Sequence, residues 1–300
     1  MVPLLRFDEL RKSYGEKSVL RGLTFEVRPG EMFGFCGANG AGKTTAMRIA
    51  LGMATADSGA VSWAGRSIGV AERERIGYMP EERGLYGRMK PADQLVYLAR
   101  LSGMKAAVAR ARANEWLERL NVKMRPADTL DKLSLGNQQK VQLIASVIHE
   151  PEVLILDEPF SGLDPVATDT LADVLDDIRA TGVPVLFSSH QLDLVERLCQ
   201  RVGIMSGGAL VAVGGVEELR RAHGQRRLAI TLSDPVTPEW PARLPVGRII
   251  QRDAAAMLAE IGPDHRLDEI VSAAQALGTI RHLSVVEPTL FDIFRNVVSA

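Results

Sequence analysis

The 300-residue sequence predicts an α/β domain with a helical insertion, followed by a small α+β domain. Three observations predict this fold. Short β-rich runs alternate with helical segments in the first two thirds of the chain, residues 85–150 show helical spacing alone, and the pattern changes after about residue 225. We therefore expect a first domain over residues 1–222 and an accessory domain over residues 226–300.

Short apolar runs mark the strands of the first domain. Residues 31–37 (EMFGFCG), 152–158 (EVLILDE) and 183–190 (VPVLFSSH) have the composition of strands that are buried on both faces of a parallel sheet. Between the last two runs, a helical pattern has Pro165 near its start and Gly182 after its end. Working loops of such a domain lie at the carboxyl ends of its strands.

The insertion and the accessory domain have different patterns. In the insertion, PADQLVYLARLSG and AAVARARANEWLERLNV carry apolar residues at helical spacing. In the accessory domain, RRLAITLS and IRHLSVVE are typical of strands, whereas HRLDEIVSAAQALG and TLFDIFRNVV are typical of helices. The Pro-rich stretch TPEWPARLP predicts a turn region between them.

Composition narrows the class of protein. A chain that is 46% hydrophobic and 24% charged is an ordinary folded protein, and its net charge of −1 argues against a nucleic acid partner. No segment approaches the ~20 apolar residues that span a bilayer, and early charges argue against a secretory signal. Cys36 and Cys199 are expected to be buried, reduced thiols. We therefore expect a cytoplasmic protein.

Residues 37–45, GANGAGKTT, fit the phosphate-loop pattern G-x-x-x-x-G-K-[ST] between a strand and a helix. Glycines in this loop let backbone N–H groups converge on an anion, and the helix that follows directs its positive end there. Lys43 would contact the β- and γ-phosphates, and the Thr44 hydroxyl would bind Mg²⁺. The predicted loop contacts come from Gly37, Asn39, Gly40, Ala41, Gly42, Lys43, Thr44 and Thr45. This is a site for a nucleoside triphosphate.

Two acidic residues follow the second apolar run. Asp157 is placed to hold Mg²⁺ through water, and Glu158 to orient the attacking water and accept its proton. Alone, two such acids are more often a solvated turn, but a phosphate loop in the same chain favours the catalytic interpretation. His190 ends the third run, where a γ-phosphate contact is plausible, although a single histidine is usually structural. Glu158, His190 and Lys43 are therefore the predicted catalytic residues.

These motifs in this order resemble the ATP-binding subunits of ABC transporters, over residues 4 to about 220. The resemblance implies that the chain binds ATP and Mg²⁺ and hydrolyses ATP. It implies that Tyr14 stacks on adenine and that His190 is the switch histidine. The stretch SGLD (161–164), which ends in Asp164, matches the loop through which two nucleotide sites communicate.

The stretch LSLGNQQ (133–139) lies where this family keeps its signature, usually Leu-Ser-Gly-Gly-Gln. In the family, the signature of one subunit closes over the ATP of another. The resemblance therefore implies that Ser134 and the backbone of Gly136 contact a γ-phosphate at the positive end of the following helix. The implied partners are a second ATP-binding subunit, as a homodimer, and integral membrane permease subunits that hold the chain on the inner face of the membrane.

The chain departs from the family pattern at three positions. Leu135 replaces the third residue of the signature and Asn137 replaces the fifth, so we expect function with altered closing. In PEERGLY (80–86), Glu81 matches a family Gln that contacts Mg²⁺, and we expect Glu81 to bind the metal. The alternative is that Glu81, Glu82 and Arg83 form a solvated helix cap.

Several motifs, with the α+β tail, resemble the bacterial export-type branch of the family, which includes sodium-efflux and multidrug proteins. Two other functions stay open. A soluble clamp acting on ribosomes or DNA is disfavoured by the single phosphate loop and the lack of a heptad array or basic excess. A regulator that binds ATP without hydrolysing it is disfavoured by Glu158 and His190.

Overall fold

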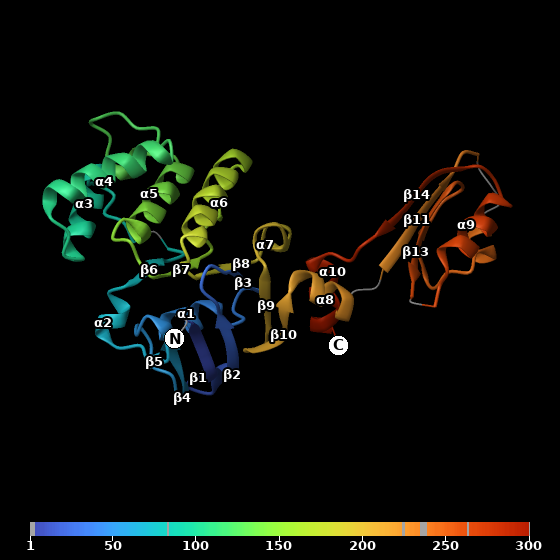
Figure 1. Cartoon of the computed structure of the whole chain (residues 1–300), viewed down its shortest axis with the longest axis horizontal. Helices are drawn as coiled ribbons and strands as arrows, with labels where there is room; N and C mark the ends of the chain where they lie inside the picture. Colours follow the sequence, from blue (N-terminus) through green and yellow to red (C-terminus); the bar gives the residue numbers. More distant parts are fainter. Residues whose placement is uncertain (1–3, 83, 224–225, 235–238, 263, 300) are drawn as a thin grey trace. The chain divides into compact units, whose positions relative to one another are not determined.

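The computed structural model describes residues 4–82, 84–223, 226–234, 239–262 and 264–299. The chain divides into two compact units, Met1–Gly215 and Val216–Ala300 (Figure 1).

Six strands form the central sheet of the first unit. They are β3 (Met32–Gly37), β6 (Ile76–Met79), β7 (Val153–Asp157), β8 (Val185–Ser189), β9 (Arg201–Ser206) and β10 (Ala209–Gly215). Their order is β10-β9-β3-β8-β7-β6, and only the pair of β10 with β9 is antiparallel. The three predicted runs are β3, β7 and β8, which lie side by side, so their carboxyl ends meet at one edge.

An antiparallel sheet covers one face of this unit. It consists of β1 (Leu5–Tyr14), β2 (Lys17–Val27), β4 (Ser58–Trp63) and β5 (Arg66–Ser67), in the order β2-β1-β4-β5. Its inner face packs on β3 through aromatic rings: Phe25 lies 4.3 Å from Phe7 and 5.1 Å from both Phe33 and Phe35, between ring centroids. This sheet was not expected from the sequence.

Several helices cover the opposite face, whereas the first helix of the unit, residues 43–50, packs in the core with the antiparallel sheet. The helices of the first unit are α1 (Lys43–Ala50), α2 (Val70–Arg73), α3 (Pro91–Leu101), α4 (Ala106–Arg119), α5 (Leu135–Val147), α6 (Pro165–Ala180) and α7 (Leu192–Leu198). Figure 1 shows α3 to α6 on the side of the central sheet away from the antiparallel sheet. Within the described part of the predicted insertion, residues 85–150, there are α3, α4, α5 and a short 3₁₀ turn but no strand.

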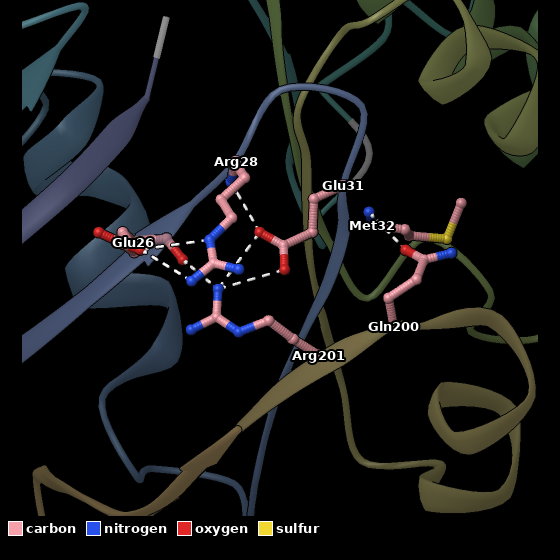
Figure 2. Close-up of polar contacts among 6 residues, drawn as sticks. All are labelled: Glu26, Arg28, Glu31, Met32, Gln200 and Arg201. Atoms are coloured by element: carbon pink, nitrogen blue, oxygen red, sulfur yellow. Dashed lines mark hydrogen bonds and ion pairs between the residues drawn. The ribbon is translucent and has the colours of Figure 1, made fainter. Parts of the chain in front are cut away.

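A network of charged residues joins the beginning of β3 to its neighbours (Figure 2). Glu31 is buried and accepts hydrogen bonds from the Arg28 N–H at 2.7 Å and from the Arg201 guanidinium at 3.2 Å. Arg201 also donates to the Glu26 carbonyl at 3.3 Å. Hydrogen bonds of this kind offset the cost of burying a carboxylate. The network therefore anchors β3 at the end opposite to the phosphate loop.

The second unit has its own sheet and core. Its strands are β11 (Arg226–Leu232), β12 (Ile249–Arg252), β13 (Ala256–Ile261) and β14 (Ile280–Val286), all antiparallel, in the order β12-β13-β11-β14. Its helices are α8 (Val216–His223), α9 (Leu267–Gln275) and α10 (Leu290–Ser299). Trp240 is fully buried in the core with Leu228, Ile230 and Ile270.

The accessory domain differs from its prediction in detail. β12 and β13 were not expected. The predicted turn region, residues 237–245, contains a 3₁₀ turn, Trp240–Arg243, and its residues 237 and 238 lie outside the described residues. Helix α8 contacts α10 and belongs to the second unit, whereas the predicted first domain extended to residue 222.

Candidate functional site

A cavity of about 510 Å³ opens at the carboxyl ends of the central strands. It lies where β3 passes into α1 and where β6 and β7 end. Its lining residues are Tyr14, Lys17, Val19, Asn39, Gly40, Ala41, Gly42, Lys43, Thr44, Thr45, Glu81, Asp157 and Glu158. Apart from Lys17 and Val19, all of these were predicted site residues. The fold therefore gathers four separated segments of the sequence into one site.

The loop before α1 has the backbone of an anion site. Gly40 and Gly42 have φ values of +80° and +110°, a conformation that side chains with a Cβ rarely adopt. A Cβ on Gly42 would lie 2.8 Å from the Val19 carbonyl oxygen. Gly42 is the N-cap residue of α1 and, having no side chain, makes no cap hydrogen bond to the first turn of this helix. Backbone N–H groups at the positive end of α1 are thus available to an anion.

The Lys43 ammonium is held within this loop. Lys43 is buried, and its Nζ donates to the Gly37 carbonyl at 2.7 Å and to the Ala38 carbonyl at 3.4 Å. These bonds use two of the three donors of an ammonium group. Gly37 itself does not line the cavity; its carbonyl positions Lys43.

Asp157 ends β7 as a buried carboxylate with one oxygen unsatisfied. Its Oδ1 accepts a hydrogen bond of 2.5 Å from the Ser188 hydroxyl. Its Oδ2 is buried and has no hydrogen-bond partner among the described residues. Such an oxygen is costly unless something binds it, and carboxylate oxygens are ligands that Mg²⁺ prefers.

Glu158 stands next to it in a strained conformation. Its φ is +51°, and its backbone N–H donates to the Ser188 hydroxyl at 2.9 Å. Its Oε2 lies 3.0 Å from His190 Nδ1, while Oε1 is buried with no partner in the described part of the chain. Burial raises the pKa of Glu158, although the hydrogen bond to His190 and the charge of Lys43 oppose the rise. A raised pKa makes this carboxylate a better proton acceptor.

Ser188 was missed by the sequence analysis. It lies in β8 beside Asp157, and its hydroxyl both donates to Asp157 and accepts from Glu158. In the sequence, nothing distinguishes Ser188 from Ser189, the next residue along the chain. Only the strand pairing selects Ser188, because it brings that residue opposite Asp157.

Three predicted residues lie at the edge of the site. Tyr14 is 55% exposed at the rim, where a flat ligand could stack on its ring. His190 does not line the cavity and reaches it through Glu158. Glu81 lines the cavity from the segment between β6 and α3, whose described residues form no helix, and Arg83 lies outside the described residues.

Ser134, Gly136 and Asp164 do not line this cavity. Ser134 caps α5, and its hydroxyl accepts a hydrogen bond of 3.4 Å from the Asn137 N–H. Asp164 caps α6 and accepts a bond of 2.8 Å from the Ala167 N–H. The structure thus separates the signature stretch from the phosphate loop of the same chain.

Comparisons with known proteins give the following likenesses. A family model described as ABC transporter matches residues 20–161, and one described as ATP-binding protein DrrA1-3-like, C-terminal domain, matches residues 214–298. The chain is 40% identical to the uncharacterized ABC transporter ATP-binding protein YhaQ of Bacillus subtilis (strain 168), over 99% of each protein.

The chain is also 36% identical to Nod factor export ATP-binding protein I of Paraburkholderia xenovorans (strain LB400), over 72% of each protein. Among solved structures, the ATP-binding subunit of an ABC transporter matches with a TM-score of 0.68 and 32% identity, over 74% of this chain and 93% of that one.

Proposed function

The chain belongs to the ABC transporter ATP-binding proteins, which are ATPases, and on that premise we propose that it powers an exporter. In this proposal two copies bind two MgATP between them and drive separate membrane-spanning subunits. The observation that carries the proposal is the cavity that joins the phosphate loop, Asp157 and Glu158, while Ser134 lies outside it.

The site fits Mg²⁺. Asp157, Thr44 and Glu81 all line the cavity, and the buried Oδ2 of Asp157 has no hydrogen-bond partner among the described residues. Magnesium sites of this kind use few protein ligands and complete their shell with water and phosphate oxygens. When bound, the ion would neutralise negative charge that develops on the phosphates. In this proposal, Asp157 and Thr44 hold it and Glu81 joins them from the β6 side.

Glu158 is the proposed proton acceptor. In hydrolysis, a water oxygen forms a bond to the γ-phosphorus, the bond to the ADP oxygen breaks, and the water proton passes to a base. The buried Oε1 of Glu158 has no partner among the described residues, and the pKa of this carboxylate is raised. His190 holds Oε2 at 3.0 Å and so orients the carboxylate. Lys43 and the first turn of α1 stabilise the phosphates.

The exposed beginning of α5, which carries the signature stretch, is evidence for the proposed pairing of two copies. Ser134 and Leu135 are exposed, and Leu135 has 53% of its surface accessible. The first turn of α5 has the partial positive charge of a helix start. In a pair of chains, Ser134 and the Gly136 backbone would reach the γ-phosphate that the other copy holds. Asp164, at the start of α6, would lie between the two sites.

A second cavity supports a membrane-spanning partner. It measures about 290 Å³ and lies between the end of β6, α3 and α5, with Tyr78, Leu98 and Leu101 in its lining. Leu101 is 68% exposed and the neighbouring Tyr97 is 45% exposed. Large apolar side chains at the rim of a cavity are typical of a surface that binds another protein.

Location and direction complete the proposal. Among the residues that the structure describes, no helix is long and apolar enough to cross a membrane. We therefore place the chain in the cytoplasm, on the inner face of the membrane, through that partner. We propose export as the direction of transport because one relative is named a Nod factor export ATP-binding protein.

Sedimentation of the Glu158→Gln variant tests the pairing. We expect its mass to double with MgATP, because the variant binds ATP without hydrolysing it. Adding Ser134→Arg should abolish the doubling, since a bulky cation would block the signature surface. Adding Ser102→Arg, the same change at another exposed position of the helical region, should leave it intact. A Glu158→Gln chain that binds MgATP yet stays monomeric would contradict the proposed dimer.

A further inference from the structure

Helix α5 holds the Glu81 segment through one buried side chain. The Gln142 amide nitrogen donates to the Pro80 carbonyl at 2.6 Å and to the Glu82 carbonyl at 3.3 Å. Gln142 is only 3% exposed. Its amide therefore binds the backbone on both sides of Glu81, and leaves the Glu81 side chain to the nucleotide cavity.

These contacts determine which way the Gln142 amide faces. Two carbonyl acceptors require the NH₂ group, so Oε1 faces elsewhere. That oxygen is buried and has no hydrogen-bond partner within the described residues. An unpaired buried amide oxygen costs free energy. A leucine would avoid this cost but would leave the Pro80 and Glu82 carbonyls without their donor, so this side chain is placed for its bonds to the segment.

The backbones of α5 and β6 are also too close to slide independently. A Cβ on Gly77 would lie 2.2 Å from the Ser146 carbonyl oxygen. One turn before Gln142, the Gln139 amide donates at 2.9 Å to the Pro159 carbonyl, which directly follows Glu158. One face of α5 thus contacts both segments that bring carboxylates to the cavity.

We propose that Gln142 is a positioning residue that couples the signature end of α5 to Glu81. The proposal rests on the proposed function, in which Ser134 contacts the ATP of the second copy. Ser134 and Gln142 are separated by about 12 Å of continuous helix, which moves as one body. When Ser134 engages the partner's ATP, Gln142 carries the Glu81 segment to its place in its own cavity. Each site thereby responds to the engagement of the other.

The test is a double-mutant cycle on ATP hydrolysis by the full chain. Gln142→Leu should lower kcat about tenfold, as expected for a lost buried hydrogen bond that acts on positioning. The KM for MgATP should stay within about twofold, because Gln142 does not touch the phosphate loop. In a Glu81→Ala background, Gln142→Leu should lower kcat no further. Gln142→Met, which has a similar length and no donor, replaces the leucine variant if that one fails to fold.

Ser146→Ala is the matched control. It lies on the same helix face and is buried, but its hydroxyl donates to Leu143 of its own helix at 2.7 Å. Its kcat should be that of the wild type. The proposal is overturned if Gln142→Leu leaves kcat unchanged, or lowers it equally with and without Glu81. A wild type that neither pairs nor hydrolyses ATP would instead overturn the proposed function, and this inference with it.

Discussion

Two helix beginnings in the first unit carry the motifs that are predicted to bind phosphate, and they differ in how the N–H groups of their first turns are capped. Helix α1 begins at Gly42 without a side-chain cap and opens into a cavity. Helix α5 begins at Ser134, whose hydroxyl caps it through a long bond of 3.4 Å to Asn137, and this end is exposed.

The difference shows which contacts one chain can make alone. The beginning of α1 has a first turn without a side-chain cap and a buried ammonium, which suit a phosphate, and two carboxylates beside them, which suit a metal ion and a water. The beginning of α5 has a hydroxyl and a positive helix end, and it does not line the cavity at α1. We infer that the first end binds nucleotide by itself and that the second acts only on the nucleotide of another copy. Three predictions test this contrast.

The largest effect is expected at the α1 end. Lys43→Ala should weaken MgATP binding to the isolated chain roughly a hundredfold, since a buried cation that faces the phosphates is lost. Ser134→Ala should leave the same binding constant unchanged. Titration calorimetry measures both, with the exposed Lys105→Ala as the charge-matched control. If Lys43→Ala and Ser134→Ala weakened MgATP binding equally, the proposed difference between the two helix ends would be wrong.

A smaller effect, on the pairing of two chains, is expected when Asn137, which binds the Ser134 hydroxyl, is replaced. The Asn137 amide donates to Ser134 Oγ at 3.0 Å and bonds both backbone groups of Lys123, at 3.2 and 3.4 Å. Asn137→Ala should therefore weaken MgATP-driven pairing of the Glu158→Gln chain about tenfold. Because the bonds go to the backbone, Lys123→Ala should pair normally in the same sedimentation assay. Normal pairing of Asn137→Ala would show that Ser134 needs no support.

The smallest effect is on stability, and its sign should differ between the two ends. Ser134→Ala removes a helix cap and should lower the free energy of unfolding by about 1 kcal/mol or less. Glu158→Gln should raise it at neutral pH, because burial disfavours the charged carboxylate. Thermal unfolding measures both, and a stabilising Ser134→Ala would contradict the assigned cap.

The pH dependence of the Glu158→Gln effect follows from the raised pKa of Glu158. The folded state holds this proton more tightly than the unfolded state, so the carboxyl contributes stability below the unfolded pKa. That contribution is lost as pH rises through the raised, folded pKa. The stability advantage of the Glu158→Gln variant over the native chain should therefore be largest at neutral pH and vanish below the ordinary value of 4.5.

Much of the fold could be predicted where the sequence pattern is local. The strands β3, β7 and β8 are continuous apolar runs, all of whose residues are buried, and such runs stand out. The antiparallel sheet was missed because β1 mixes buried and exposed residues irregularly, with a bulge around Glu9, whose φ is +47°. A strand with this pattern has no clear period in the sequence.

The family and the ATPase activity were predicted from motifs and are confirmed by the comparisons. The roles of the individual site residues stay predictions. Their placement is informative all the same, because residues as far apart in sequence as Tyr14 and Glu158 line one cavity.

The sequence by itself determined the phosphate loop, the acidic strand end and the signature, because each is a short segment whose chemistry depends on neighbouring residues. Only the tertiary structure decided which serine bridges Asp157 and Glu158, which amide holds the Glu81 segment, and that Ser134 lies outside its own cavity. These depend on strand register and helix packing between segments far apart in the chain. A hydrogen bond forms only when two groups lie within about 3 Å of each other, and the spacing of residues along the chain does not give that distance.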